Sequence, residues 1–503
     1  MLKTYSDFMN EITPDELYDR LIQYGLFSEK LPPIFDCSDF LKFCKKEKRP
    51  IFAQQWYPYA VFYSMKNVNI PRTIGIPAPM AHERVCACLK QNWSELQKFF
   101  STVTSENTIN ISRIHIRKMH DTNALFKMNY SNWKTDGTPE PDISLGKKYL
   151  VKADISNCFP SIYTHAIPWA IATKNEAKNN VGDNTIWYNT LDLETRNSTN
   201  GETHGLLIGP HTSNILSELI LCEIDRNLSN KWEYTRKIDD YFCYVNSKDE
   251  AENFLIQLNY WLREYNLTIN HKKTEIVELP IATAEQWANQ IQDKIVYLEK
   301  FHPYVDYLEV QAIMDFCIEL MHRNKDNASI LFYGIKVLSG HNLTPNAKKY
   351  VEKAATSLGL NYPYIVPLLD QFVYAPYKTS FEDLKIYINR IFDRYISKDC
   401  FEAVSYAIYY STKYNLVLEN FNVETIISKN DCILSLCALI YCRHYNLRKS
   451  LDLLKKHAKS LKKNGDFIAQ WPFTFECLTV GLVEDSWKEL KKDKVSFLKA
   501  EYR

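Results

Sequence analysis

The sequence contains few of the residues that form flexible linkers. Its 503 residues include only 13 glycines, and no Ser/Gly-rich or Pro-rich stretch separates one part of the chain from another. Such stretches let domains move independently, so we expect the domains of this chain to be joined compactly. A single hydrophobic core stops growing at about 250 to 300 residues, and the length therefore predicts two domains.

Long apolar runs and paired cysteines are also missing. No apolar stretch reaches the roughly 20 residues that a membrane helix requires, and residues 1–7 lack the apolar segment of a signal peptide. The 13 cysteines are scattered and form no CxxC pair. We therefore expect a cytoplasmic protein with no membrane partner, with reduced, mostly buried thiols and without a zinc site.

Neither sign of charge dominates the chain, because Lys and Arg number 61 while Asp and Glu number 60. A nucleic-acid partner would therefore have to be held by local basic patches. Hydrophobic residues make up 46% of the sequence and charged residues 24%. These proportions exclude disordered and fibrous classes and indicate an ordinary folded chain.

The pattern of expected elements changes near residue 288. Thr13-Pro14-Asp15-Glu16 is typical of a helix start with a capping box, and a β-like run over residues 70–76 and a helix over residues 81–99 follow. Later, apolar residues recur at helical spacing over residues 313–321, 331–338, 381–392, 403–410, 432–442 and 451–461. We expect an α+β fold, with a mixed domain over residues 1–288 and an all-helical, solenoid-like domain over residues 289–503.

Two acidic sites lie at the ends of strand-like runs. Asp154 ends the run from Lys147, and the pair Asp239-Asp240 stands between two β-rich runs, as at the turn of a hairpin. An Asp-Asp pair alone is a common turn dipeptide. If the hairpin packs beside the first strand, however, the carboxylates come close together, and such mutually repelling groups are tolerated when Mg²⁺ or Mn²⁺ neutralises them.

The order of these motifs resembles that of the reverse transcriptase family. Motif A is residues 154–159, motif B residues 205–214 and motif C residues 237–240. The resemblance implies a polymerase with Asp154, Asp239 and Asp240 as catalytic residues. It also implies that these three and Ile155 hold the metal ions, and that Ile155 and Gly205 contact the nucleotide.

Further positions fit the same resemblance and complete an expected dNTP site. Lys66, Arg72 and Arg84 match the fingers segment that grips the triphosphate, which requires cationic donors. Lys273 matches the motif D lysine near the leaving pyrophosphate. Phe159 matches the aromatic residue that lies against the sugar 2′ position and favours dNTPs over NTPs. Alternatively, Lys66 is an ordinary surface charge and Phe159 an ordinary aromatic residue of the core.

Two positions depart from the family pattern. Ile208 stands where motif B usually has Gln, and Lys237 replaces the aromatic residue that opens motif C. Both positions lie near template, primer or nucleotide in ordinary reverse transcriptases. Neither change removes a metal ligand, so we expect activity with unconventional use of a template.

These departures, with residues 163–169 and 202–205, resemble the bacterial abortive-infection reverse transcriptases of the AbiK and P2-prophage types. That resemblance implies a fingers and palm core followed by a HEAT-like helical repeat domain. It also implies phage defence, DNA synthesis without a conventional template, a tyrosine primer that leaves DNA covalently attached, and a homo-oligomer.

Two other functions stay open. Some defense-associated relatives copy a dedicated noncoding RNA, and a catalytically degenerate core would leave a nucleic-acid-binding scaffold. The basic helix expected around residues 448–463 could follow a phosphate backbone, although a solvated helix face explains it more simply.

Overall fold

The computed structural model describes residues 3–47, 49, 51–66, 70–105, 107, 109, 111–113, 116–118, 137–281, 286–301 and 304–503. The described chain is mostly helical with two small antiparallel sheets. Within these residues no helix has the length and apolar character needed to span a bilayer. All 13 cysteines are free, and all but Cys477 are buried, which confirms the expectation of mostly buried thiols.

The first expected helix begins where the sequence indicates, with the Thr13 half of the expected capping box present. In α2 (Pro14–Tyr24) the Thr13 side chain accepts a hydrogen bond from the Glu16 amide, and Pro14 occupies the first turn. The single helix expected over residues 81–99 is instead two helices, α4 (Pro79–Gln91) and α5 (Trp93–Thr104). The break is at Asn92, whose side-chain amide donates to the Cys88 carbonyl oxygen and so ends α4.

The first sheet is a hairpin of β1 (Tyr59–Met65) and β2 (Pro71–Pro77), paired from Tyr59↔Pro77 to Met65↔Pro71. Alternate residues of β1 are buried, and these are Ala60, Phe62 and Ser64. A two-stranded hairpin is marginally stable in isolation. Helices from the C-terminal half of the chain cover the β1–β2 hairpin.

The second sheet has the strand order β4-β5-β3-β6. Its members are β3 (Tyr149–Asp154), β4 (Tyr234–Lys237), β5 (Asp240–Val245) and β6 (Glu275–Glu278). The β4–β5 hairpin packs beside β3 in antiparallel register, as expected from the sequence. Two long helices, α12 (His211–Ser229) and α13 (Lys248–Glu264), pack against each other, and α13 contacts β3 and β5.

Short elements connect these parts. They are α1 (Tyr5–Asn10), α3 (Ser38–Cys44), α7 (Glu140–Ile143), α8 (Cys158–Ser161), α9 (Ala166–Ala172), α10 (Lys174–Asn179) and α11 (Trp187–Asn197).

Every element described from Gln286 onward is helical, and the six helices expected there are present. The longer ones are α14 (Gln286–Phe301), α15 (Tyr307–Arg323), α16 (Ser329–Ser339), α17 (Pro345–Asn361), α19 (Phe381–Ile396), α20 (Phe401–Lys413), α22 (Cys432–His444) and α23 (Arg448–Lys463). The shorter ones are η2 (Pro363–Leu368), η3 (Asp370–Tyr374), α18 (Ala375–Tyr377), α21 (Val423–Ser428), α24 (Trp471–Cys477), η4 (Val480–Leu482), α25 (Asp485–Lys492) and η5 (Ala500–Tyr502). They stack in chain order, with α15 on α16, α19 on α20 and α20 on α22.

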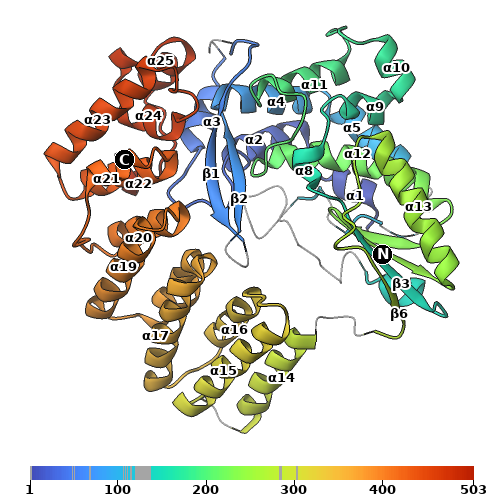
Figure 1. Cartoon of the computed structure of the whole chain (residues 1–503). Helices are drawn as coiled ribbons and strands as arrows, with labels where there is room; N and C mark the ends of the chain where they lie inside the picture. The colour runs from blue at the N-terminus through green and yellow to red at the C-terminus, as the bar shows by residue number, and fades with distance from the viewer. Residues whose placement is uncertain are drawn as a thin grey trace.

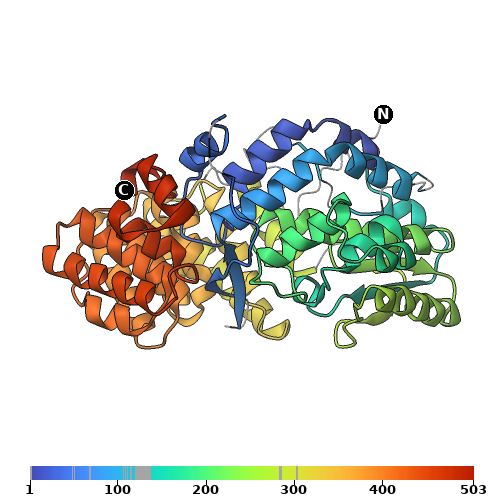
Figure 2. The same ribbon diagram turned by 90° about the horizontal axis from the view of Figure 1, so that it is seen from above.

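This stack of helices forms an arc that starts below the four-stranded sheet and returns to the β1–β2 hairpin (Figures 1 and 2). At its far end the amide of Asp36 donates to the Phe497 carbonyl (2.9 Å), and the amide of Lys499 donates to the Ile34 carbonyl (2.9 Å). The indole N–H of Trp471 donates to the Ile76 carbonyl of β2 at 3.3 Å. The C-terminal helices therefore hold the hairpin on the side away from the four-stranded sheet.

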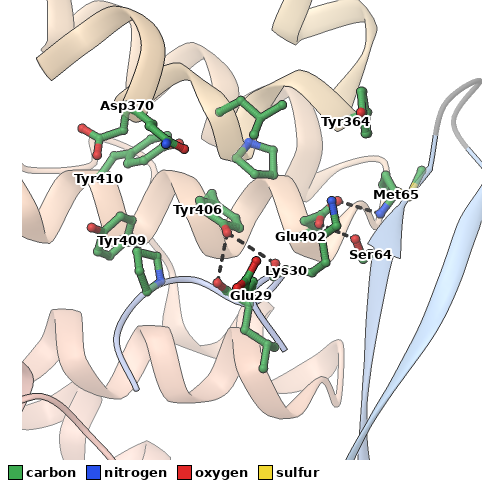
Figure 3. Close-up of a pocket in the computed structure, with 15 residues that line it drawn as sticks. Glu29, Lys30, Ser64, Met65, Tyr364, Asp370, Glu402, Tyr406, Tyr409 and Tyr410 are labelled. Carbon is green, nitrogen blue, oxygen red and sulfur yellow. Dashed lines mark hydrogen bonds between the residues drawn. The ribbon is translucent and has the colours of Figure 1, made fainter. Parts of the chain in front are cut away.

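A buried carboxylate makes a second contact between this arc and the hairpin (Figure 3). Glu402 on α20 is 2% exposed. Its Oε1 accepts from the Ser64 hydroxyl at 2.8 Å, and its Oε2 accepts from the Met65 amide at 2.6 Å. Burial raises the pKa of this carboxyl to about 7, although both donors and the charge of Lys30 favour its ionised form.

The raised pKa of Glu402 predicts a pH-dependent stability. The folded-state pKa of Glu402 exceeds the value of about 4.3 for an exposed glutamate. The contribution of this carboxyl to the free energy of unfolding is therefore greatest below about pH 4.3, and it is lost as the pH rises through about 7. In Glu402→Gln the side-chain amide is uncharged at every pH, and it can still form hydrogen bonds with Ser64 and Met65. In calorimetry, we expect Glu402→Gln to have a higher Tm than the wild type at pH 8 and a much smaller advantage at pH 5. An equal difference at both pH values would contradict this.

Candidate active site

The three aspartates meet at one end of the four-stranded sheet. Asp154 ends β3 and is paired in register with Asp240, the first residue of β5. The amide of Ile155 donates to the carbonyl oxygen of Asp239 at 3.1 Å. Packing the hairpin beside β3 therefore brings the acids together, as expected from the sequence. Asp154 is buried, Asp239 is half-buried and Asp240 is exposed.

A two-residue turn, Ile238-Asp239, joins β4 to β5. Ile238 has a φ of 61°, a left-handed conformation that is a genuine outlier for a β-branched side chain. Such strain persists only where the surroundings hold the backbone in place. In this turn the support comes from Arg236.

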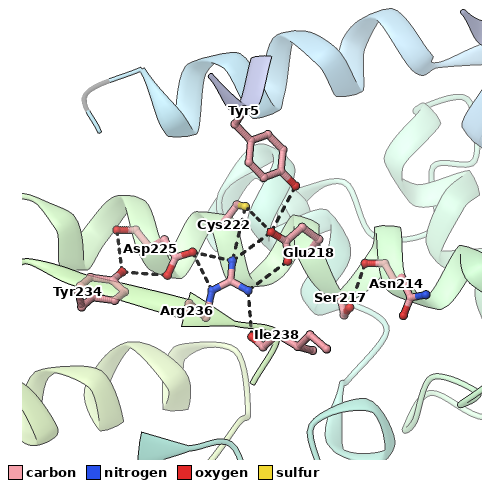
Figure 4. A network of polar contacts seen from close by, with 9 residues as sticks. All are labelled: Tyr5, Asn214, Ser217, Glu218, Cys222, Asp225, Tyr234, Arg236 and Ile238. Atoms are coloured by element: carbon pink, nitrogen blue, oxygen red, sulfur yellow. Dashed lines mark hydrogen bonds and ion pairs between the residues drawn. The ribbon is translucent and has the colours of Figure 1, made fainter. Parts of the chain in front are cut away.

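Arg236 is fully buried and links the turn to α12 (Figure 4). Its Nη1 donates to the Ile238 carbonyl oxygen at 2.9 Å and to Glu218 at 3.1 Å. Its Nε and Nη2 donate to Oδ2 of Asp225 at 2.8 and 2.6 Å. Asp225 also accepts from the Tyr234 hydroxyl at 2.8 Å. A buried guanidinium with two carboxylates thus fixes the backbone just before Asp239.

This network was not predicted from the sequence, although the sequence contains a signal for it. Arg236 and Tyr234 are two residues apart and so share one face of β4. Glu218 and Asp225 are seven residues apart and so share one side of α12. Which helix would face which strand is a tertiary property, and the pattern alone does not give it.

The carboxylates of motif C have raised pKa values. Burial is the main cause for Asp239, and the charge of Asp154 adds to it. Burial together with the charges of Asp239 and Asp154 raises the pKa of Asp240 to about 6. Burial thus disfavours the ionised form of both carboxylates, and their mutual repulsion adds to this effect.

The Asp154 carboxylate has two partners from the segment after α13. The Asn270 side chain donates to Oδ1 at 2.8 Å, and the Lys273 ammonium contacts Oδ2 at 2.6 Å. The Asn270 amide also donates to the Asp154 carbonyl at 2.7 Å. Lys273 therefore lies at the acids, where the hydrogen bond to Asp154 raises its pKa. Asn270 was not anticipated from the sequence.

A cavity of about 580 Å³ opens between this end of the sheet and the β1–β2 hairpin. Eight of the expected site residues line it, namely Lys66, Arg72, Asp154, Ile155, Phe159, Gly205, Asp239 and Lys273. Partial burial lowers the pKa of Lys66, as do the nearby charges of Arg72 and Lys273. Cations from the hairpin and carboxylates from the sheet thus face one space.

Motif B forms one wall of this cavity and packs directly on β2. The Gly75 amide donates to the Ile208 carbonyl at 2.9 Å, and a Cβ at Gly75 would approach the Leu207 side chain to 2.7 Å. Gly205 has a φ of 95°, which favours glycine, and its amide donates to the Ile162 carbonyl at 2.9 Å. Ile208 lines the cavity in the place where the family usually has Gln.

Arg84 is the expected nucleotide-binding residue that the structure does not bring to this cavity. Its guanidinium donates to both carboxylate oxygens of Glu194, at 2.8 and 2.5 Å, and to the Phe52 carbonyl at 2.8 Å. Glu194 is 1% exposed and needs a cationic partner. We therefore assign Arg84 a structural role and leave it out of the nucleotide site.

Among the described residues, no group of three or more His, Cys, Asp or Glu side chains is arranged to hold a metal ion. Both oxygens of Asp154 are instead engaged by Asn270 and Lys273. The donor set is nevertheless carboxylate oxygen, which suits Mg²⁺ or Mn²⁺. A divalent cation would also relieve the repulsion that raises the pKa of Asp239 and Asp240. Lys273 and a divalent ion would compete for the Oδ2 atom of Asp154.

Comparison with protein families agrees with this geometry. Residues 76–313 match the family model of the reverse transcriptase (RNA-dependent DNA polymerase). This match covers a little less than half of the chain and indicates a domain of the reverse transcriptase type over residues 76–313. Such a domain implies a nucleotidyltransferase of the reverse transcriptase type. The match contains all three aspartates and Lys273, whereas Lys66 and Arg72 precede it and most of the helical arc follows it.

Two solved structures give partial similarity over much of the chain. Telomerase from Candida albicans, in complex with the TWJ fragment of telomeric RNA, is 11% identical with a TM-score of 0.30, covering 70% of this chain and 66% of that one. Apo telomerase from Candida tropicalis is 11% identical with a TM-score of 0.30, covering 79% and 73%. The chain thus spans just under two thirds of the first structure. No curated protein sequence matches the chain.

Proposed function

We propose that this protein is an anti-phage DNA polymerase of the abortive-infection reverse transcriptase type, which polymerises dNTPs in the cavity between the hairpin and the four-stranded sheet. The observation that carries the polymerase function is the convergence of Asp154 and Asp239 with Lys66 and Arg72 on that cavity. The sequence resemblance of residues 163–169 and 202–205 supports the role in defence.

Each residue has a distinct task in this proposal. Lys66 and Arg72 bind the triphosphate, for which multidentate cations are suited, and Phe159 lies against the sugar. Asp154 and Asp239, with the backbone at Ile155, would hold the divalent ions. Those ions would activate the attacking hydroxyl and stabilise the leaving pyrophosphate.

Lys273 changes partner in this scheme. Its ammonium contacts Asp154 at 2.6 Å, and its side chain is 64% exposed. With a metal ion held by Asp154, this ammonium would be available to face the leaving pyrophosphate. Lys273 would thus offset the charge of Asp154 before the nucleotide binds and part of the pyrophosphate charge afterwards.

The surroundings of the acids support synthesis that does not follow a conventional template. Ile208, an apolar residue, lines the cavity, and the Lys237 ammonium is exposed and lies 5.7 Å from the Phe242 ring. We propose a protein tyrosine as primer, so that the DNA product is covalently attached. We further propose that the stacked C-terminal helices form a HEAT-like repeat domain within a homo-oligomer.

The test is to incubate purified protein with labelled dNTPs and Mg²⁺, treat the product with protease, and sequence it. We expect DNA of no fixed sequence whose mobility changes after protease treatment. A product that matches a co-purifying RNA would favour the alternative enzyme that copies a noncoding RNA. No synthesis under any condition would overturn the polymerase proposal and leave the nucleic-acid-binding scaffold.

The Phe159 ring gives a separate prediction on substrate choice. Phe159 lines the cavity and is half-buried, and its carbonyl accepts from the Leu206 amide at 2.8 Å, which ties it to motif B. Removing the ring opens space for a ribose hydroxyl. We expect Phe159→Ala to lower the preference for dNTPs over NTPs by about 10- to 100-fold in kcat/KM. An unchanged preference would mean that Phe159 serves only the core.

A further inference from the structure

The hairpin that carries Lys66 presents one edge of β1 to the helical arc. The Lys66 amide donates to the Ile70 carbonyl across the hairpin at 2.8 Å. Amide groups alternate in direction along a strand, so the preceding amide, of Met65, points away from β2. A backbone N–H left unpaired there would be costly. It donates to Oε2 of Glu402 at 2.6 Å.

Glu402 holds the last two residues of β1, directly before Lys66 (Figure 3). In addition to the Met65 amide, its carboxylate accepts from the Ser64 hydroxyl, which is also buried, at 2.8 Å. Above the pKa of about 7 the carboxyl is ionised, and these become charge-assisted hydrogen bonds, which are stronger than those between neutral groups. Two successive amides are thus bonded, that of Met65 to Glu402 on α20 and that of Lys66 to the Ile70 carbonyl.

The same helix makes a second contact that does not involve the hairpin. Tyr406, one turn after Glu402 on α20, donates its hydroxyl to the Leu31 carbonyl at 3.0 Å. Both side chains line a cavity of about 210 Å³ between α20, the hairpin and the segment near Leu31. Tyr406 therefore anchors α20 to the N-terminal part, whereas Glu402 bonds to the last two residues of β1, directly before Lys66.

We propose that Glu402 is a positioning residue for Lys66, through which the helical arc sets the geometry of the nucleotide grip. This inference rests on the proposed function, in which Lys66 binds the triphosphate. The Glu402 carboxylate bonds to Ser64 and Met65 of the hairpin and not to the acids of the four-stranded sheet within the described part of the chain, so its loss should weaken nucleotide binding and leave the chemical step intact. The expected signature is a higher KM for dNTP at an almost unchanged kcat.

A double-mutant cycle in the full-length protein tests this proposal. We expect Glu402→Ala to raise KM for dNTP by about fivefold to tenfold, the scale of losing charge-assisted hydrogen bonds. Glu402→Gln, which can still accept from Met65 and donate to Ser64, should stay within about twofold of the wild type. In a Lys66→Ala background, Glu402→Ala should have little further effect, because two residues that act through one contact are not additive.

Two further variants separate positioning from a general loss of structure. Tyr406→Phe removes the hydroxyl that donates to the Leu31 carbonyl and should leave KM unchanged. Ser64→Ala removes one of the two donors to Glu402 and should raise KM by less than Glu402→Ala does. This variant replaces Glu402→Ala in the test if Glu402→Ala does not fold. Circular dichroism melting of every variant shows whether it is folded at the assay temperature.

The outcomes distinguish this proposal from the proposed function. If Glu402→Ala raises KM as much in the Lys66→Ala background as in the wild type, positioning through Lys66 is overturned and the polymerase proposal stands. The same holds if Glu402→Gln is as impaired as Glu402→Ala. If Lys66→Ala itself leaves KM unchanged, the nucleotide role of Lys66 is overturned together with its positioning by Glu402.

Discussion

Replacing Asp239 with asparagine is expected to lower dNTP incorporation by roughly a thousandfold or more, the scale of losing a preorganised electrostatic group at a reacting centre. Asp239 lies at the turn beside Asp154 and lines the cavity that also holds Lys66 and Arg72. The substitution keeps the size of the side chain and removes its charge. The loss should appear in kcat, measured as labelled nucleotide incorporated under saturating dNTP.

The stability of Asp239→Asn should move in the opposite direction to its activity. Burial and the charge of Asp154 raise the pKa of Asp239, so its ionised form is disfavoured in the folded protein. Without added metal, the variant should melt at or above the wild-type temperature at pH 8. The wild type should gain stability when Mn²⁺ is added, by mass action on the folded state, and the variant should gain much less.

Asp240→Asn is the matched control for this experiment. Asp240 is exposed and is not among the residues that line the cavity. We expect it to lose less activity than Asp239→Asn. Full synthesis by Asp239→Asn would contradict the assignment of the site.

Arg236→Ala is expected to destabilise the protein by about 3 to 5 kcal/mol, the range measured when one partner of a buried ion pair is removed. Arg236 is fully buried between Asp225 and Glu218, and its loss leaves both carboxylates without their cation. Urea unfolding followed by circular dichroism measures this change. A loss below about 1 kcal/mol would mean that the two acids find another partner or take up protons.

A compensated variant separates stability from positioning. Arg236→Met combined with Glu218→Gln and Asp225→Asn removes all three charges together, which costs far less than removing one. It also removes the bond from Arg236 to the Ile238 carbonyl, which supports the turn before Asp239. We expect this variant to recover most of the lost stability and to remain impaired in kcat. Wild-type kcat in the compensated variant would mean that the turn holds its conformation without Arg236.

Local patterns in the sequence predicted the elements and the meeting of the acids. The β-rich runs around Asp154 and Asp239 pair in the sheet as expected, because strand propensity and a two-residue turn leave few other arrangements. The C-terminal helices were predictable for the same reason, since apolar spacing of three and four residues is a local property. The expected helix over residues 81–99 was wrong only at Asn92, where a side-chain cap divides it.

Contacts between distant segments could not be predicted in this way. Arg84 fits the fingers motif by sequence, yet its partner Glu194 lies 110 residues away and has no local signature. Glu402 meets Ser64 across 338 residues, so the return of the helical arc to the hairpin was equally hidden. The position of Lys273 at Asp154 depends on a chain segment that passes beside β3, which only the fold reveals.

The most direct measurement of the proposed site is diffraction from crystals grown with Mn²⁺ and a non-hydrolysable dNTP, recorded where manganese scatters anomalously. We predict anomalous peaks at the carboxylates of Asp154 and Asp239, with the Lys273 ammonium displaced and the triphosphate against Lys66 and Arg72. Manganese and nucleotide bound elsewhere, with Lys273 still paired to Asp154 at saturating nucleotide, would contradict a polymerase site in this cavity.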